Sequence, residues 1–278
     1  MSIPDYPIRI ISRIDIKGPN VVKGIHLEGL RVLGNPHDFV RLYSEAGADE
    51  IFYQDVVASL YGRNSLEEHI ERAAEEAAVP LMVGGGIRNL DAVRRILRSG
   101  ADKVAINTEA TKRPEFITEV AEVFGSSTIV GVIEAIRVGE RWMAFCDNGR
   151  ENTGLEVGEW AEKLQELGVG EIVLTSVDRE GTGDGCDLGL IEHVRHRLNV
   201  PLIVHGGVGS PVQALEVFSL GASALAVAAM FHYTSLRRGD LVAGVANKIE
   251  EGNRLFLSSG KVLPHFEIAG ITELKDYL

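Results

Sequence analysis

The stretch VPLMVGGGIRNLDAVRRILRSGADKVAINTEA begins at Val79, and the stretch VPLIVHGGVGSPVQALEVFSLGASALAVAAMF begins at Val200. The two align residue by residue at an offset of 121 positions, and the same offset places Gly47 on Gly168. A repeat of about 120 residues is longer than the repeating unit of a solenoid or a propeller. The sequence therefore indicates one domain built from two copies of a half-domain.

Short apolar runs rich in β-branched residues alternate with amphipathic stretches, the pattern of alternating strands and helices. Proline follows Asn35 and Ser210, as in the first turn of a helix, and Ser65 with Glu68 predicts a capping box. Eight strands with about eight helices predict an α/β fold, a closed parallel (β/α)8 TIM barrel with a twofold half-barrel repeat, rather than an open doubly wound sheet. The expected strands are residues 8–16, 50–54, 81–84, 103–106, 128–134, 171–175, 202–205 and 224–227.

The last part of the chain has no counterpart in the first half. We expect residues 1–253 to form the barrel and residues 254–278 to form a C-terminal tail that packs on it. Residues 272–278 have a short helical pattern, so the tail is expected to end in a helix.

Composition argues against several classes of protein. The chain has 278 residues, 45% hydrophobic and 24% charged, as in soluble globular proteins. Its net charge of −12 without a basic run argues against nucleic-acid binding, and it contains no apolar run of about 18 residues to cross a membrane. Without a secretion signal, we expect a cytoplasmic protein. Cys146 and Cys186 lack metal-ligand spacing and are expected to be reduced thiols, and no metal or other cofactor is predicted.

Glycines follow the third and seventh expected strands, at the end of the barrel where active sites lie. Glycine lets backbone amides approach a phosphate, so the matching places predict two anion sites across the barrel mouth. A ligand with a phosphate at each end would span them. The alternative is that the glycines only form tight turns. The residues concerned are Gly84, Gly85, Gly86, Asn107 and Thr108 at the first site and Gly206, Gly207, Ala228 and Ala229 at the second.

Two carboxylates end strands that face each other across the mouth. Asp15 lies near the end of the first strand, before a loop that carries Lys17 and Lys23, and Glu134 ends the fifth. We expect the carboxylates to act as general acid and general base on one substrate, unless each only pairs with a nearby cation. A polar loop, residues 178–182, follows the sixth strand, and we expect it beside the second phosphate site unless it is merely solvated.

Charged residues of alternating sign stand at the N-terminal starts of the first, second, fourth and sixth strands. If they point inward, they form a ring around the barrel axis. One interpretation is a salt-bridged plug that completes the core, yet buried ion pairs add little stability over apolar packing. The ring is therefore also a candidate entry for a small polar molecule. Its members are Arg9, Glu50, Lys103 and Glu171.

The motifs IDIKGPNVVKG, VGGGI, GADKVAINT and GEIVLTSVDREGT, with the late pair of glycines, resemble the cyclase subunit of imidazole glycerol phosphate synthase over residues 8–235. The resemblance implies a (β/α)8 barrel of histidine biosynthesis, a lyase and cyclase. Such an enzyme uses ammonia and a bis-phosphorylated ribonucleotide to make imidazole glycerol phosphate and an aminoimidazole carboxamide ribonucleotide. The resemblance also implies a glutaminase subunit at the N-terminal face of the barrel that sends ammonia through it.

Matched residue by residue, the resemblance assigns catalysis to Asp15 and Lys23 and the ammonia gate to the charged ring. Asp102 matches a residue that faces the partner. The matched phosphate positions are Gly86, Asn107 and Thr108 at one site and Gly181, Gly207, Ala228 and Ala229 at the other.

The departures from the family pattern surround the substrate and spare the gate. Glu134 and Glu180 stand where aspartates are usual, which moves each carboxylate by about 1.5 Å, and such a misplacement costs on the order of 10²-fold in rate. Ala229 stands where a serine is usual. Three further departures are candidates for setting specificity toward a different anionic ligand: Arg13 for a small residue, Gln54 for an apolar one and His205 for a serine.

These departures leave three alternatives to the histidine enzyme. The first is a paralogue that supplies ammonia for amidation of a nucleotide-linked sugar in surface-polysaccharide biosynthesis. The second is a non-catalytic scaffold that docks and activates a glutaminase, which Asp15→Asn would leave unaffected. The third is a sugar-phosphate isomerase on the sister barrel of histidine biosynthesis, against which the KGPNVVKG loop and the charged ring argue.

Overall fold

Eight parallel strands close into a barrel in the computed structural model, which describes residues 7–58, 67–241 and 266–278. The strands pair in chain order, and the last pairs in parallel with the first, so the sheet closes on itself. The predicted (β/α)8 barrel is confirmed and the open sheet is wrong. The strands are β1 (Arg9–Lys17), β4 (Glu50–Asp55), β5 (Leu81–Gly84), β6 (Lys103–Ile106), β7 (Ile129–Val138), β10 (Glu171–Ser176), β11 (Leu202–His205) and β12 (Ala224–Val227).

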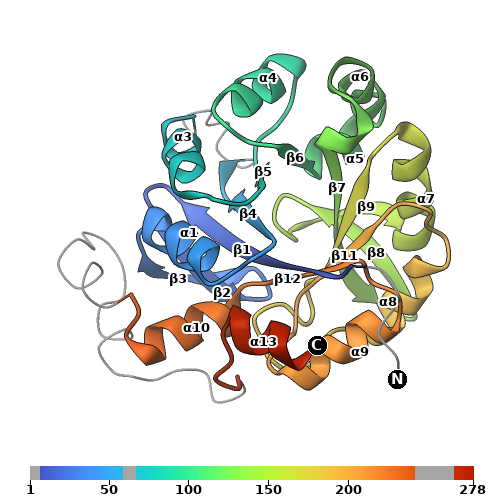
Figure 1. Cartoon of the computed structure of the whole chain (residues 1–278). Helices are drawn as coiled ribbons and strands as arrows, with labels where there is room; N and C mark the ends of the chain where they lie inside the picture. Colours follow the sequence, from blue (N-terminus) through green and yellow to red (C-terminus); the bar gives the residue numbers. More distant parts are fainter. Residues whose placement is uncertain (1–6, 59–66, 242–265) are drawn as a thin grey trace.

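Helices surround the strands (Figure 1). Asn35 and Ser210 cap two of them, since their side chains accept hydrogen bonds from the backbone N–H groups of His37 at 2.9 Å and Gln213 at 3.4 Å. Both predicted caps are confirmed, whereas Ser65 lies outside the described residues. The helices are α1 (Pro36–Glu45), α3 (Glu67–Glu76), α4 (Leu90–Arg98), α5 (Thr108–Lys112), α6 (Glu115–Phe124), α7 (Val157–Leu167), α8 (Leu188–Arg195), α9 (Pro211–Ser219) and α10 (Ala229–Arg238), with a short 3-10 turn, η1 (Ser126–Thr128).

Two β-hairpins extend the barrel at the C-terminal ends of its strands. β2 (Asn20–Ile25) and β3 (Glu28–Gly34) form the first, where the sequence predicted a loop after β1. β8 (Arg141–Cys146) and β9 (Glu151–Glu156) form the second, and β8 pairs antiparallel with the extension of β7 beyond Glu134. The sequence predicted none of these four strands, because glycine and charged residues interrupt β2, β3 and β9, and β8 is only six residues long.

The expected boundary at residues 253 and 254 lies outside the described residues, but the chain ends in α13 (Ile271–Tyr277). Ile271 and Leu274 of this helix are buried in the main core. Lys275 Nζ donates to the carbonyl of Gly47 at 2.8 Å and contacts Asp49 Oδ1 at 2.6 Å. α13 is therefore held against the segment that joins α1 to β4.

Inward-facing side chains divide the barrel interior into three layers. The charged ring occupies the N-terminal end, and polar side chains occupy the C-terminal end. Between them lies an apolar layer, separate from the core that joins strands to helices. Its buried members are Ile11, Phe52, Met82, Ala105, Val130, Val132, Val173, Ile203, Ala224 and Ala226.

Candidate active site

A layer of polar side chains caps the apolar interior at the C-terminal ends of the strands. Thr175 of β10 is in register with Glu134 of β7 and with His205 of β11, so these three residues share one level of the barrel. Arg13 of β1 and Gln54 of β4 line one cavity together with Glu134. The structure therefore brings the proposed specificity residues to the mouth, where a substrate of a TIM barrel binds.

Asp15 is buried between two cations. Arg13 Nε donates to Asp15 Oδ1 at 2.8 Å, and Lys23 Nζ lies 3.7 Å from Oδ2. Burial alone would raise the pKa of Asp15, but the charges of Arg13 and Lys23 outweigh it and lower the pKa to about 2. Asp15 is therefore ionised at neutral pH, and the ion pairing that the sequence analysis left as an alternative is present.

Glu134 is also buried at the mouth, but its neighbours offset the cost of burying its charge less than those of Asp15 do. The backbone N–H of Gly149 donates to Glu134 Oε2 at 2.7 Å. Burial nevertheless raises the pKa of Glu134 to about 7, although the Gly149 bond, the charge of Arg13 and a bond to Asn107 all act to lower it. The environment therefore drives the pKa values of the two carboxylates far apart, as in sites where one carboxyl group exchanges a proton and the other stays charged.

His205 presents an acceptor rather than a charge. Its Nδ1 lies 2.9 Å from the carbonyl oxygen of Ala226, so the proton resides on Nδ1. Burial and the charge of Arg13 lower the pKa of His205 well below its usual value. Its buried Nε2 has no hydrogen-bond partner in the part of the chain that the structure describes. A neutral His205 can therefore accept a hydrogen bond from a ligand at Nε2.

The β2–β3 hairpin closes one side of the mouth. Lys23 Nζ contacts Glu180 Oε1, and burial lowers the pKa of Lys23 to about 8 despite the nearby Asp15. Glu180 Oε2 accepts a hydrogen bond from the backbone N–H of Leu27 at 3.0 Å. A Cβ on Gly181 would lie 2.4 Å from the carbonyl oxygen of Gly24. Glu180 and Gly181 are therefore packed under the hairpin rather than solvated.

The first predicted phosphate site faces a cavity of about 340 Å³. Gly85 and Gly86 stand in the turn after β5 with φ of 112° and 68°, values that favour glycine. The cavity runs from this turn to the polar layer at the strand ends. Its lining includes Gly86, Asn107, Thr108, Arg13, Gln54 and Glu134.

The second predicted site lies on the opposite half of the barrel. Gly206 and Gly207 have φ of 100° and 106°, and a Cβ on Gly207 would lie 2.2 Å from the carbonyl oxygen of Gly185. Ala228 and Ala229 are buried where α10 begins. Close approach of the chain to itself therefore requires the two glycines, so the tight-turn alternative accounts for them with or without a ligand.

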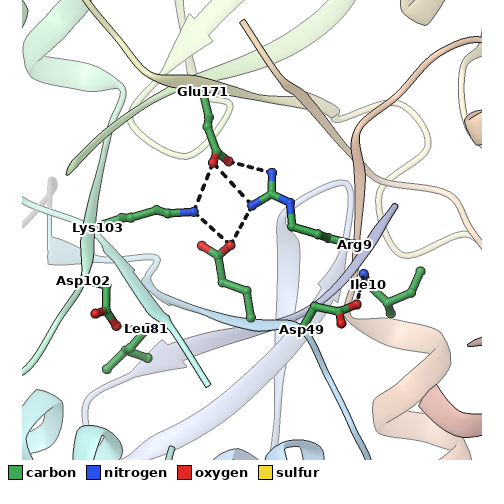
Figure 2. Close-up of polar contacts among 8 residues, drawn as sticks. Arg9, Ile10, Asp49, Leu81, Asp102, Lys103 and Glu171 are labelled. Carbon is green, nitrogen blue, oxygen red and sulfur yellow. Dashed lines mark hydrogen bonds and ion pairs between the residues drawn. The ribbon is translucent and has the colours of Figure 1, made fainter. Parts of the chain in front are cut away.

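The charged ring is closed at the other end of the barrel (Figure 2). Arg9 contacts Glu50 at 3.0 Å and Glu171 at 2.9 Å, and Lys103 contacts the same two carboxylates at 3.0 and 3.1 Å. Asp102, beside the ring, accepts a hydrogen bond from the backbone N–H of Leu81 at 2.8 Å. The ring separates solvent at this end from the apolar layer.

Comparison with known proteins identifies the family. Residues 9–237 match the model of the family described as histidine biosynthesis protein. The imidazole glycerol phosphate synthase subunit HisF of Legionella pneumophila is 53% identical over 203 residues, which cover 73% of this chain and 96% of that protein. The proteins of that name from Pyrococcus furiosus and Thermococcus onnurineus are 44% and 42% identical, over 81% and 86% of this chain and 90% and 95% of theirs.

The chain belongs to the HisF family. Membership makes it a synthase subunit, an enzyme of the lyase class, as the sequence predicted. None of the helices described for this HisF-family chain is both long and apolar enough to cross a bilayer.

The two cysteines of this HisF-family chain are free and buried. Burial raises the pKa of Cys146 to about 11 and that of Cys186 to about 12, so both are thiols at neutral pH. Cys146, Asp147 and Glu151 lie close together, a cluster that the sequence analysis did not foresee. Lys112 pairs with Asp147 at 3.3 Å and with Glu151 at 3.9 Å, so an ammonium group already compensates these carboxylates.

Two groups that complete the site of this HisF-family chain were not predicted from the sequence. Gly149, which donates its backbone N–H to Glu134, lies in the turn of a hairpin that the sequence did not predict. Thr175, which accepts a hydrogen bond from Arg13, was not named as a site residue. The motif DNG at residues 147–149, between the runs RWMAFC and ENTGLE, was the available signal for that turn.

Proposed function

We propose that the chain is an ammonia-dependent cyclase and lyase acting on the bis-phosphorylated ribonucleotide of histidine biosynthesis. The observation that carries the proposal is the pair of carboxyl groups at the mouth, Asp15 with a pKa of about 2 and Glu134 with a pKa of about 7. Glu134 would donate and accept the protons of ring closure and cleavage. Asp15 would stay charged, stabilise positive charge on the attacking nitrogen and keep Arg13 and Lys23 in place.

Binding of a ligand with two phosphates is supported by the layout of the mouth. The cavity beside Gly86, Asn107 and Thr108 would take one phosphate, and the turns at Gly181 and Gly207 would take the other. The polar layer lies between these two positions, where the reacting part of the ligand would sit.

Ammonia would enter from a glutaminase subunit docked at the N-terminal face of the barrel. The ring of Arg9, Glu50, Lys103 and Glu171 covers that end of the interior, and its ion pairs need only separate locally to admit a small molecule. Neutral ammonia can cross the apolar layer above the ring, whereas a hydrated ion would lose its solvation there. The buried, unpaired thiols also fit a cytoplasmic protein.

Specificity would reside in Arg13, Gln54 and His205. Arg13 is bonded through Nε to Asp15 and through Nη1 to Thr175 at 3.5 Å, and no described residue accepts a hydrogen bond from its Nη2. The Arg13 donor favours a neutral or anionic acceptor in the middle of the ligand, and the free acceptor of His205 favours a hydroxyl or amine donor beside it. The second candidate function, amidation of a nucleotide-linked sugar, draws its support from these two residues.

Steady-state turnover tests the first function. Purified chain is given an ammonium salt at high pH and the phosphoribulosyl substrate of histidine biosynthesis, and the absorbance change of that substrate is followed. Turnover that Asp15→Asn abolishes supports the histidine cyclase and rules out a non-catalytic scaffold. A folded protein without turnover would contradict it, and nucleotide-linked sugars would be tried next.

A further inference from the structure

Two hairpin turns over the mouth contain non-glycine residues in the left-handed backbone conformation. Among the described residues, the non-glycine positions with positive φ are His26 at 56°, Leu27 at 61°, Asp147 at 52° and Asn148 at 61°. The first two turn β2 into β3, and the other two turn β8 into β9. This conformation costs a bulky side chain free energy and persists where surrounding contacts impose it, commonly at functional sites.

The two turns are bonded to each other. The buried Asn148 side chain donates through Nδ2 to the carbonyl oxygen of Leu27 at 3.1 Å. On the other side, Leu27 and His26 donate their backbone N–H groups to Glu180, at 3.0 and 2.9 Å. The turn of the first hairpin is thus held between the second hairpin and the loop after β10.

The residue after Asn148 reaches the reacting carboxyl group. The Gly149 N–H, which donates to Glu134 Oε2 at 2.7 Å, belongs to the peptide that joins Asn148 to Gly149. The direction of this N–H is therefore set by the backbone angles of Asn148. Its hydrogen bond favours the ionised form of Glu134, and Glu134 is otherwise buried.

We propose that Asn148 is a positioning residue for Glu134: its bond to Leu27 holds the β8–β9 turn in the left-handed conformation that aims the Gly149 N–H at the Glu134 carboxyl group. The proposal rests on the role of Glu134 in the proposed function. The position of the first hairpin is then coupled to the proton affinity of Glu134. The Asn148 side chain bonds to that hairpin, and the Asn148 backbone orients the N–H that Glu134 accepts.

Two variants remove the bond in different ways. Asn148→Gly loses the side chain and tolerates positive φ without strain, so it protects the test against misfolding. Asn148→Ala loses the same bond but keeps a Cβ in the left-handed region. Asn152→Ala is the matched control, because Asn152 lies in the same hairpin and bonds only locally, to the Gly154 N–H at 2.9 Å.

The ionisation of Glu134 is the readout. Carboxyl ¹³C NMR of the full-length chain, with Glu134→Gln to assign the resonance, follows its titration, and the pH profile of kcat/KM follows its effect on rate. We expect both Asn148 variants to raise the midpoint by about one pH unit, because a hydrogen bond to a charged group is weakened. Asn152→Ala should leave it unchanged.

An unchanged midpoint in both Asn148 variants would overturn the proposal, even if they unfolded at lower temperature, since a structural role alone lowers stability without moving this titration. The NMR measurement needs no turnover. A chain inactive on the histidine intermediate would contradict the proposed function and still test the position of Asn148.

Discussion

The charges next to each carboxyl group decide what the two acids at the mouth can do. Asp15 has cationic nitrogens at 2.8 and 3.7 Å, so its pKa falls to about 2 although it is buried. Glu134 is equally buried but is bonded to a neutral backbone donor, and its pKa rises to about 7. Of these two acids, only Glu134 can therefore exchange a proton near neutral pH without a large free-energy cost.

Glu134→Gln tests that role. The amide keeps the size of the side chain, and its oxygen can still accept the Gly149 N–H, so the protein should fold. We expect kcat with ammonium to fall by roughly 10²- to 10⁴-fold, the usual loss when a general acid–base group is removed. Glu134→Asp installs the residue more usual in the family and keeps an ionisable group, so it should lose less activity than Glu134→Gln. Unchanged turnover by Glu134→Gln would contradict the assignment.

The stability of the protein at acid pH should report on Asp15. Its folded pKa of about 2 lies below the ordinary value of 3.8, so its contribution is present above about pH 4 and is lost as the pH falls toward 2. The shift corresponds to about 2 kcal/mol in the free energy of unfolding. Urea unfolding between pH 2 and pH 6 measures it.

Asp15→Asn supplies the control for that titration. At neutral pH the variant should be less stable by about 3 kcal/mol, because the buried Arg13 loses its charged partner. Its stability should also change less between pH 4 and pH 2 than that of the unmodified protein. Identical pH dependence of the two proteins would show that Asp15 is not the titrating group.

At the scale of elements, turns rather than helices shape the mouth. The β2–β3 hairpin lies on the loop after β10 so closely that a Cβ at Gly181 would meet the Gly24 carbonyl oxygen at 2.4 Å. The turn after β11 is packed in the same way, against Gly185. Such positions need glycine both for positive φ and for lack of a side chain.

Gly207→Ala and Gly139→Ala separate these two requirements. Both positions have positive φ, 106° and 64°, but a Cβ at Gly207 would lie 2.2 Å from Gly185 O, whereas nothing lies within 4 Å at Gly139. We expect Gly139→Ala to cost about 1 kcal/mol and Gly207→Ala about 3 kcal/mol or more in the free energy of unfolding. Equal losses in urea unfolding would show that the turn after β11 relaxes freely.

The whole molecule places two polar layers at opposite ends of one apolar interior. The charged ring faces the side where α13 and Asp49 lie, and the polar layer with Arg13, Glu134 and His205 faces the hairpins. The two layers are also joined along single strands, since β1 carries Arg9 and Arg13 and β4 carries Glu50 and Gln54. The proposed function uses both ends, because ammonia would enter at the charged ring and react at the polar layer.

Lys103→Met tests the ring at that scale. It removes the ion pairs to Glu50 and Glu171 and leaves those to Arg9. With the glutaminase partner present, we expect the ratio of glutamine-driven to ammonium-driven turnover to fall about tenfold, equivalent to roughly 1.4 kcal/mol, because ammonia escapes or is blocked at the ring. Arg72→Met, which breaks the exposed pair with Glu68, is the control. An unchanged ratio would leave the ring as a structural plug.

The sequence alone determined the barrel, its eight inner strands and the level at which most site residues lie. It could do so because the 121-residue repeat and the short apolar, β-branched runs are visible along the chain without knowledge of any tertiary contact. Ring residues such as Arg9 and Glu50 could be placed together because parallel strands start at one end of the barrel.

Only the tertiary structure decided which groups meet across the mouth. The contacts of Lys23 with Asp15 and Glu180, the difference in pKa between Asp15 and Glu134, and the bond from Gly149 depend on hairpins that fold back over distant parts of the chain. Proton affinity is set by burial and by charges within a few ångströms, and those distances exist only once the chain has closed.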